Sequence, residues 1–340
     1  MASQADNIGV SVIIPAKNEE RFIEKCLSSL IEGTSPEFKM EIVVVDAMST
    51  DATRTIVEKI SQKHPFVKCI DNPDIETQKG LNKGIKQAAY PWVMIAGAHA
   101  AYPKGYIENV YKKIVALSAD GAGGMLHTDV LNKNKRSLSI CQVLSHPVGV
   151  GNSMFRIGAK KPVKVDTVPF GIYKKSLFDE VGYYDERLKR NQDIEWSRRL
   201  KADKKNIYLI PDMACTYYAR ENFKSLAVNN FNNGLWNLMT VFLTRNLKSL
   251  SIRHFMPFAF LSFLVLTALA GLFYTSLWFL GLFVVALYLV VIAIAALSIK
   301  TKSKGTSFLY LCYAFMVLHF SYAVGSFIGL LKITGRIFKK

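Results

Sequence analysis

The sequence predicts an α/β domain with a mostly parallel sheet, followed by C-terminal transmembrane helices. The first observation is that short apolar runs alternate with amphipathic stretches over the first third of the chain. The second is the segregation of charge, because residues 255–299 and residues 305–331 hold no Asp, Glu, Lys or Arg. A helix needs about 20 apolar residues to cross a bilayer, so the first uncharged run can supply two spans and the second run one.

Four apolar runs have the length and composition of buried strands, at residues 10–16, 41–47, 66–71 and 92–98. Amphipathic stretches separate them, at residues 18–33, 49–62 and 77–88. Ser49 or Thr50 is placed to cap the second of these helices. Strands this apolar are typical of a parallel sheet that helices cover on both faces, and ligands of such sheets bind beyond the carboxyl ends of the strands.

The middle of the chain is less regular, and order returns with an expected strand at 163–171 and expected helices at 174–180 and 191–203. Residues 222–254 interleave apolar side chains with Asn, Lys and Arg, which suits a segment at the membrane surface. The predicted organisation is a cytoplasmic domain over 1–221, an interface segment over 222–254 and transmembrane helices over 255–340.

The net charge of +17 comes from basic residues that crowd beside the apolar runs. They are Arg245, Lys248 and Arg253 before the first run, Lys300, Lys302 and Lys304 between the runs, and Lys332, Arg336, Lys339 and Lys340 after the second. Cations in these places indicate contact with membrane lipids at the cytoplasmic leaflet. They form no single stripe of the kind that binds nucleic acid, so we expect no nucleic-acid partner.

The expected location is the cell membrane, with several passes and the first domain on the cytoplasmic side. The polar residues 1–9 lack the apolar core of a signal peptide. A span at 256–274 would lead the chain out of the cytoplasm, and a span at 277–299 would lead it back. The cations between the two uncharged runs would then lie on the cytoplasmic side. A third full span over 307–331 would put the last cations outside, against the positive-inside rule. Either this segment is a re-entrant or tilted helix pair interrupted near Gly325, or the rule fails here.

Polar side chains gather where the predicted strands end. Pro15, Ala16 and Glu19 lie at or just after the end of the first strand, Asp46 closes the second, and His99 follows the fourth. In a parallel sheet these ends are neighbours on one edge, where carboxylates can hydrogen-bond a base and a ribose. Neither a G-x-G-x-x-G after the first strand nor a G-x-x-x-x-G-K-[ST] motif is present, which argues against a dinucleotide binder and a P-loop protein.

The motifs resemble those of inverting family-2 glycosyltransferases of the GT-A fold. "SVIIPAKNEE", "VVVDAMSTDAT" and "KGLNKGI" occur in the family's order. Further along, "HPVGVGNSMFR", "VDTVPFGIYKKSLFDEVGYYDERLKRNQDIEWSRRL" and "NNFNNGLW" resemble the succinoglycan-type exopolysaccharide branch. The resemblance covers about residues 9–240. It implies a nucleotide-sugar-binding domain of the hexosyltransferase type, with a donor such as a UDP-sugar and a lipid-linked acceptor.

Carried over residue by residue, the resemblance places uridine and its ribose at Pro15, Ala16 and Glu19. It places the base at Asp46 and the diphosphate near Lys79. Gly97 and Ala98 occupy the first two positions of the family's D-x-D motif, which also belongs to the nucleotide-sugar site.

Asp193 in "NQDIE" matches the family's catalytic base, with Gln192 in the place of the preceding glutamate. The base would take the proton of the acceptor hydroxyl as that oxygen attacks the anomeric carbon. The alternative is a solvated helix residue beside Arg190 and Arg198.

Gln192 and three further residues are candidates for the acceptor site or an active-site loop. His146 and Arg156 flank "PVGVGNSMF" and would either line the acceptor site or close a loop. Trp236 belongs to "NNGLW", in the place of the Q-x-x-R-W motif of processive enzymes. That motif is absent in its usual form, which argues against a processive polymer synthase.

The metal motif is where the chain departs from the family. D-x-D is usually D-A-H in the exopolysaccharide branch, and here it reads Gly97-Ala98-His99. Either His99 holds Mn²⁺ or Mg²⁺ with help from substrate and water, or basic residues such as Lys79 replace the metal, or donor binding is impaired. Imidazole favours Mn²⁺ over Mg²⁺.

Two other functions stay open at this point. One is a polyprenyl-phosphate sugar synthase, whose acceptor is the bare lipid phosphate. The other is a catalytically degenerate scaffold subunit of a polysaccharide-assembly complex, because Gly97 removes a metal ligand.

Overall fold

The computed structural model describes residues 9–337 apart from residues 152 and 251. The expectations for residues 1–8 and for Lys339 and Lys340 fall outside the described residues. The chain divides into two units, each described by itself below. The sheet unit comprises residues 1–127 and 158–218, and the helical unit comprises residues 128–157 and 219–340.

The predicted boundaries differ from this division at one place, because residues 128–157 group with the C-terminal helices. The physical reason is an apolar cluster in which Ile140 and Val143 pack with Leu311 and Phe315. These four side chains are buried, and they tie the segment to the last helix of the chain.

The sheet contains nine strands within the described residues, in the order β3-β2-β1-β4-β8-β6-β9-β5, and β7 pairs with β9. The strands are β1 Gly9–Ala16, β2 Lys39–Asp46, β3 Val67–Asp71, β4 Trp92–Ile95, β5 Ala100–Ala101, β6 Gly121–Asp129, β7 Val163–Lys164, β8 Ile172–Lys174 and β9 Ile207–Tyr218. β1 pairs in parallel with β2 and β4, and β2 pairs in parallel with β3. The predicted parallel sheet is therefore confirmed, and antiparallel pairs of β8 with β4 and β6 extend it.

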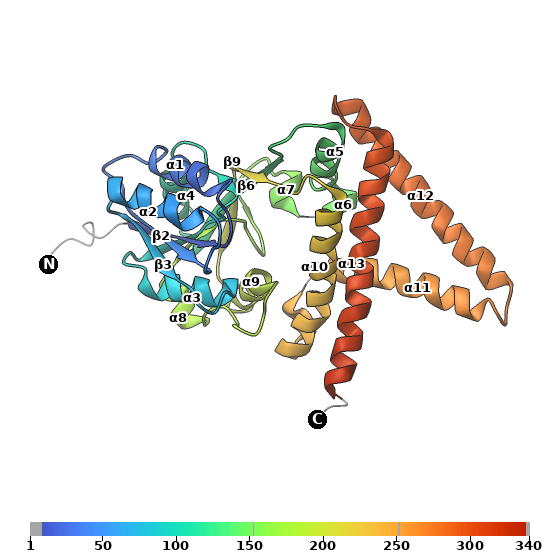
Figure 1. Cartoon of the computed structure of the whole chain (residues 1–340). Helices are drawn as coiled ribbons and strands as arrows, with labels where there is room; N and C mark the ends of the chain where they lie inside the picture. The colour runs from blue at the N-terminus through green and yellow to red at the C-terminus, as the bar shows by residue number, and fades with distance from the viewer. Residues whose placement is uncertain (1–8, 152, 251, 338–340) are drawn as a thin grey trace. The chain divides into compact units, whose positions relative to one another are not determined.

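Helices cover both faces of this sheet (Figure 1). They are α1 Ile23–Ile31, α2 Thr53–Lys63, α3 Thr77–Gln87, α4 Tyr106–Ala116, α8 Ser176–Glu180 and α9 Gln192–Ala202. Val12 and Ile14 belong to one apolar cluster with Leu27 of α1. Ile13 points to the other face, where a side chain at Gly84 of α3 would come within 2.6 Å of it. The alternation of β1 thus places α1 and α3 on opposite faces.

Three local expectations need correction. The fourth predicted strand ends at Ile95, and the residues after it form a turn. Ala52 occupies the N-cap of α2 without a side-chain cap, while the Ser49 hydroxyl donates to Asp46 instead. The strand expected over 163–171 is only the two residues of β7, and the chain then leads into β8.

The helical unit contains the C-terminal helices and the segment that joins them. Its helices are α5 Lys135–Val143, α6 Pro147–Val150, α7 Met154–Ile157, α10 Phe223–Thr244, α11 Met256–Ala270, α12 Ser276–Lys302 and α13 Phe308–Ile337, with 3₁₀ turns η2 Leu247–Ser249 and η3 Ile252–Phe255. Three stretches are long and apolar enough to cross a membrane, namely Ile252–Ala270, Ser276–Lys302 and Phe308–Gly335. The chain therefore carries the membrane-type helices that its composition predicts.

Two helices of this unit, α10 and α13, approach at backbone distance (Figure 1). A side chain at Gly325 would lie 1.9 Å from the Phe231 carbonyl oxygen, and one at Gly234 would lie 1.9 Å from the Tyr322 carbonyl oxygen. The Ser326 hydroxyl donates to the Gly234 carbonyl at 3.1 Å. Small residues allow this closeness, as at GxxxG contacts of membrane helices. Of the two alternatives for this segment, the helix pair interrupted near Gly325 is wrong: α13 runs unbroken through the glycine, which provides packing space.

Candidate functional site

The carboxyl ends of β1 and β2 lie side by side, as predicted. Ala16 is in register with Asp46, and the Ala47 N–H donates to the Ala16 carbonyl at 2.8 Å. The side chain of Asp46 is 1% exposed, and its carboxylate accepts hydrogen bonds from the backbone N–H and the hydroxyl of Ser49. A fixed acceptor at this edge can hydrogen-bond the N–H groups of a base.

The loops that follow β1 and β2 are joined by reciprocal hydrogen bonds. The Asn18 N–H donates to the Ser49 hydroxyl at 3.0 Å, and the Asn18 side chain accepts from the Thr50 N–H at 2.9 Å. The Glu19 N–H donates to the Thr53 hydroxyl at 2.7 Å. Asn18 has φ +55°, a left-handed conformation that asparagine tolerates better than most residues. The two loops therefore form one preformed rim.

His99 meets Glu19 at this rim, although the two residues are 80 positions apart. Its Nδ1 lies 3.3 Å from Glu19 Oε1. The imidazole also packs edge-on against Tyr217, with ring centroids 5.2 Å apart, because β5 pairs with β9 directly beside it. The sequence suggested a lone imidazole, whereas the structure provides an imidazole and a carboxylate together.

The position of the missing aspartate is filled by an aromatic ring. A side chain at Gly97 would lie 2.6 Å from Phe170 Cε1, so the ring occupies the space that a longer residue would need. Phe170 has φ +47°, which is unusual for a bulky residue. Contacts hold it there: its ring packs edge-on against Tyr102, and its carbonyl accepts from the Tyr106 hydroxyl at 3.3 Å.

We expect Gly97→Ala to lower stability by about 1–3 kcal/mol, because the added methyl group overpacks against Phe170. In a Phe170→Ala background the same change should cost much less, since the ring is gone. A double-mutant cycle on thermal or denaturant unfolding measures this coupling. Equal costs in both backgrounds would contradict the assignment of Phe170 as the obstacle.

The donor set for a divalent metal consists of His99 and Glu19. Within the described residues, no group of three His, Cys, Asp or Glu side chains converges on one point. Protein sites for Mg²⁺ often supply only one or two carboxylates and leave the remaining positions to substrate phosphates and water. The pair fits a metal held jointly with a diphosphate, and imidazole in the pair favours Mn²⁺ over Mg²⁺.

The loop that leads to Asp193 is held from one side by α3. The Asn82 side chain donates to the Tyr184 carbonyl at 2.9 Å and accepts from the Tyr184 N–H at 3.0 Å. Gln78 donates to the Glu186 carbonyl at 2.9 Å. Both amide side chains are buried. The "KGLNKG" helix therefore fixes the loop before the candidate base.

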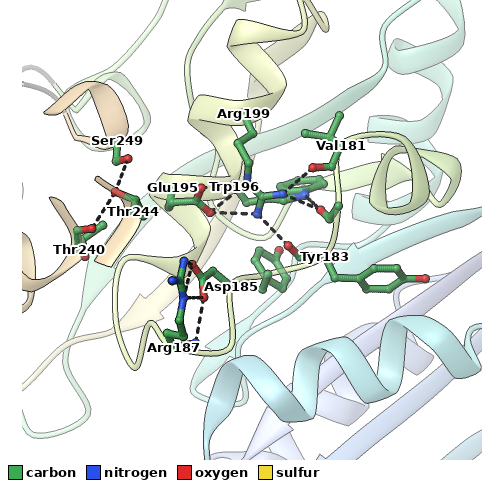
Figure 2. A network of polar contacts seen from close by, with 12 residues as sticks. Val181, Tyr183, Asp185, Arg187, Glu195, Trp196, Arg199, Thr240, Thr244 and Ser249 are labelled. Atoms are coloured by element: carbon green, nitrogen blue, oxygen red, sulfur yellow. Dashed lines mark hydrogen bonds and ion pairs between the residues drawn. The ribbon is translucent and has the colours of Figure 1, made fainter. Parts of the chain in front are cut away.

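The same loop is held from the other side by α9, as Figure 2 shows. The Arg199 guanidinium donates to the carbonyl oxygens of Val181, Gly182 and Tyr183 at 2.6, 2.9 and 2.7 Å. It also forms an ion pair with Glu195 at 2.9 Å. The Trp196 indole N–H adds a hydrogen bond to the Gly182 carbonyl at 2.9 Å.

Asp193 lies in the first turn of α9, directly after Gln192, which is the first residue of the helix. The residue is exposed, yet desolvation by the surrounding protein raises the pKa of its carboxyl, against the opposing effect of backbone hydrogen bonds. A carboxyl with a raised pKa is a stronger base, as proton abstraction requires.

The remaining predicted residues have structural partners. Lys79 is paired with Asp74 at 2.9 Å and with Glu76 at 3.7 Å, so its ammonium is already engaged at the start of α3. Pro15 lies in β1, in register with Val45. Ala98 is buried in the turn after β4.

Three of the four candidates for the acceptor site or an active-site loop belong to the helical unit, whereas Gln192 belongs to the sheet unit. His146 caps α6 by accepting from the Val148 N–H at 3.2 Å. Arg156 donates to the Thr128 hydroxyl at 3.0 Å. Both contacts are those of loop closure, and Trp236 lies in the middle of α10.

Sequence reasoning missed Phe170, Asn82 and Arg199. Asn82 lies within the "KGLNKGI" motif, and Arg199 lies four residues after Glu195 on the same helix, which is the spacing of an ion pair. These two signals were available. Nothing in the sequence indicates that Phe170 fills the space beside Gly97.

Comparison with known proteins places this site in a family. The model of "Glycosyl transferase family 2" matches residues 11–182. A relative from Methanococcus voltae, named dolichyl N-acetyl-alpha-D-glucosaminyl phosphate 3-beta-D-2,3-diacetamido-2,3-dideoxy-beta-D-glucuronosyltransferase, is 29% identical over 66% of this chain and 71% of its own length. The succinoglycan biosynthesis protein ExoA of Rhizobium meliloti is 26% identical over 66% of this chain and 67% of its own length.

A crystal structure of residues 1–349 of Staphylococcus aureus TarS is similar with a TM-score of 0.51. It covers 95% of this chain and 92% of that chain at 22% identity, which supports the fold alone. The family model matches half of the chain and includes the rim. Most of the match lies in the sheet unit, and residues 128–157 within it belong to the helical unit. The chain therefore belongs to glycosyl transferase family 2 and is a glycosyltransferase with a GT-A-like domain and C-terminal apolar helices.

Proposed function

We propose that this glycosyltransferase inverts the anomeric carbon as it transfers a sugar from a nucleoside diphosphate, UDP in the first instance, to a lipid-linked acceptor at the membrane. The observation that carries the proposal is the fixed position of Asp193. Two sets of contacts, buried on the α3 side and partly buried on the α9 side, hold the loop that leads to this carboxylate. A solvated helix residue would not require such support.

The donor side of the proposal rests on the rim at the ends of β1 and β2. Asp46 would hydrogen-bond the base, while Pro15, Ala16 and Glu19 would line the uridine and its ribose. Asp46 and Ala16 are neighbours in register, which supports a shared ligand. A divalent metal bound by His99 and Glu19 would neutralise charge on the diphosphate.

The chemical step needs one base and one leaving group. The Asp193 carboxylate accepts the proton of the acceptor hydroxyl, and that oxygen forms a bond to the anomeric carbon. The bond from this carbon to the diphosphate oxygen breaks on the opposite face, and the nucleoside diphosphate leaves with the electron pair. Gln192 adjoins the base and has no charge to compete for the proton.

The acceptor and the location follow from the apolar helices and from one relative. Three stretches can cross a membrane, which supports an enzyme tethered beside a lipid-linked acceptor. The Methanococcus voltae relative is named for transfer to a dolichyl phosphate sugar. We place the sheet unit on the cytoplasmic side, where nucleotide sugars are available, and the helices in the cell membrane.

Asp193→Asn should reduce transfer by a factor of about 10²–10⁴, the usual contribution of a general base. A labelled donor and membranes that contain the full chain provide the assay. Asp203→Asn is the matched control, because Asp203 caps the end of the same helix and its side chain is 57% exposed. Full activity of Asp193→Asn would sink the proposal, and product analysis would tell a monosaccharide phospholipid from an extended glycan.

The transfer rate should fall as the pH decreases through the pKa of Asp193. Because desolvation raises this pKa, the acidic limb of the rate profile should lie above pH 4, near which an ordinary aspartate titrates.

The same raised pKa affects stability. A folded-state pKa above the unfolded value favours the protonated form of Asp193 in the folded protein, so the stabilising contribution of this group is present at low pH and is lost as the pH rises through the folded pKa. Asp193→Asn should therefore be at least as stable as the parent near neutral pH, as unfolding curves at several pH values would show.

A further inference from the structure

The helical unit contains an open-sided cavity of about 420 Å³ that the family assignment does not explain. Its walls come from the α6 turn and from α10, η3, α11, α12 and α13. Apolar side chains such as Val150, Met256, Phe260 and Leu318 supply much of the lining. The volume lies within the range of ligand pockets, about 300–1,000 Å³, and near its lower end.

The lining changes from cationic to apolar along one stretch of chain. Arg253 lies in η3, at the start of a stretch that can cross a membrane. Its Cδ lies 3.5 Å from the position that a Cβ atom at Gly151 would occupy. Met256 and Phe260 follow on the next turns and also face the cavity. Seven helical residues rise by about 10 Å, so the cationic side chain of Arg253 and the apolar side chains of Met256 and Phe260 lie within about 10 Å of one another along the helix.

A hydrogen-bonded chain fixes the opposite wall. His319 Nε2 lies 2.9 Å from the Val148 carbonyl oxygen, and its Nδ1 lies 3.2 Å from the Tyr288 hydroxyl. A neutral imidazole satisfies both contacts, because Nε2–H donates to the carbonyl and Nδ1 accepts from the hydroxyl. The α6 turn is thereby tied to α12 and α13, and the cavity is preformed.

The charged residues of the lining indicate the chemical class of the ligand. Among the residues that the structure describes, no carboxylate lines the cavity, while Arg253 is one of the lining residues. An arginine suits a phosphate, with which it forms charge-assisted hydrogen bonds. The apolar wall beside it suits a hydrocarbon chain. The small volume suits one chain better than the paired acyl chains of a phospholipid.

We propose that this cavity binds the phosphate and the adjoining part of the chain of a polyprenyl phosphate, the lipid portion of the acceptor. Arg253 binds the phosphate, and the chain lies along Met256 and Phe260. The identification of this lipid as the acceptor rests on the proposed function. The existence of the binding site does not depend on the proposed function, so an experiment can reject either proposal without rejecting the other.

The test is photo-cross-linking of the full chain in phosphatidylcholine nanodiscs with a diazirine-bearing polyprenyl phosphate. Labelled peptides should contain residues of the cavity. Arg253→Gln should reduce labelling by about tenfold or more, as expected for a lost charge-assisted hydrogen bond. Val150→Trp should reduce it by filling the cavity while the cation remains. Arg245→Gln is the matched control, because Arg245 is an exposed arginine of the same unit that does not line the cavity.

Each outcome decides one of the two proposals. Labelling that is absent from the cavity, or unchanged in both Arg253→Gln and Val150→Trp, overturns the site. Equal competition by phosphatidylglycerol and by unlabelled polyprenyl phosphate also overturns it, in favour of a general anionic-lipid site. Sensitive labelling together with a wild-type chain that transfers no sugar supports the site and overturns the proposed function. Unfolding midpoints of the variants exclude a loss of fold as the cause.

Discussion

Arg199→Ala is expected to destabilise the sheet unit by about 3 kcal/mol, the lower end of the usual cost of removing one partner of a buried ion pair, because the Arg199 side chain is 29% exposed. The change leaves the Glu195 carboxylate, whose side chain is 9% exposed, without its cation. It also removes the donor for three consecutive carbonyl groups, at residues 181–183.

The same change should lower transfer, since the loop it fixes leads directly to Asp193. Arg199 is a positioning residue here, so its loss should act on the catalytic rate more than on donor affinity. Arg199→Lys should recover only part of the loss, because an ammonium cannot reproduce the planar fork of donors. Denaturant unfolding and a comparison of kcat with KM for the donor measure the two effects.

Lys201→Ala is the matched control on the same helix. Its ammonium pairs with Asp166, and both side chains are largely exposed, at 58% and 40%. Exposed pairs contribute about 0–1 kcal/mol, so this variant should behave like the parent. Equal destabilisation by the two variants would contradict the role assigned to Arg199.

The parts of the structure that the sequence predicts are those governed by local periodicity. Apolar runs predicted β1 to β4, and helical spacing predicted α1, α3 and α9 within a few residues. Ordered polar residues at the strand ends predicted that Ala16 and Asp46 would be neighbours, and the register of β1 with β2 brings them together.

The parts that could not be predicted depend on contacts between distant segments. Phe170 fills the space beside Gly97 because two loops 73 residues apart meet there. His99 meets Glu19 for the same kind of reason, across 80 residues. Neither contact has a periodic signal, because side-chain packing between loops is set by tertiary structure. The close approach of α10 and α13 is intermediate: "GSFIG" is a visible small-residue motif, but its partner helix is not specified by it.

Gly325→Leu is expected to disrupt the helical unit, with a loss of about 4 kcal/mol or more, which is exceptional for one substitution. The first side-chain atom would already lie 1.9 Å from the Phe231 carbonyl oxygen, so α10 and α13 must separate. Gly325→Ala should also destabilise, because this clash involves the β-carbon that both residues share. A backbone oxygen cannot move aside as a flexible side chain can, and separation would also break the hydrogen bond from Ser326 to the Gly234 carbonyl.

Gly335→Ala supplies the matched control on the same helix, because a side chain there meets no atom within 4 Å. This variant should be neutral or gain up to about 1 kcal/mol, since alanine favours a helix more than glycine does. The measurement is the unfolding midpoint of the full chain in detergent, with all three variants prepared alike. A Gly325→Ala midpoint equal to that of Gly335→Ala would show that α10 and α13 do not pack at backbone distance. A midpoint that is lowered for Gly325→Ala but not for Gly335→Ala would show that the glycine contact helps to join the asparagine-rich α10 to an apolar helix long enough to cross a membrane.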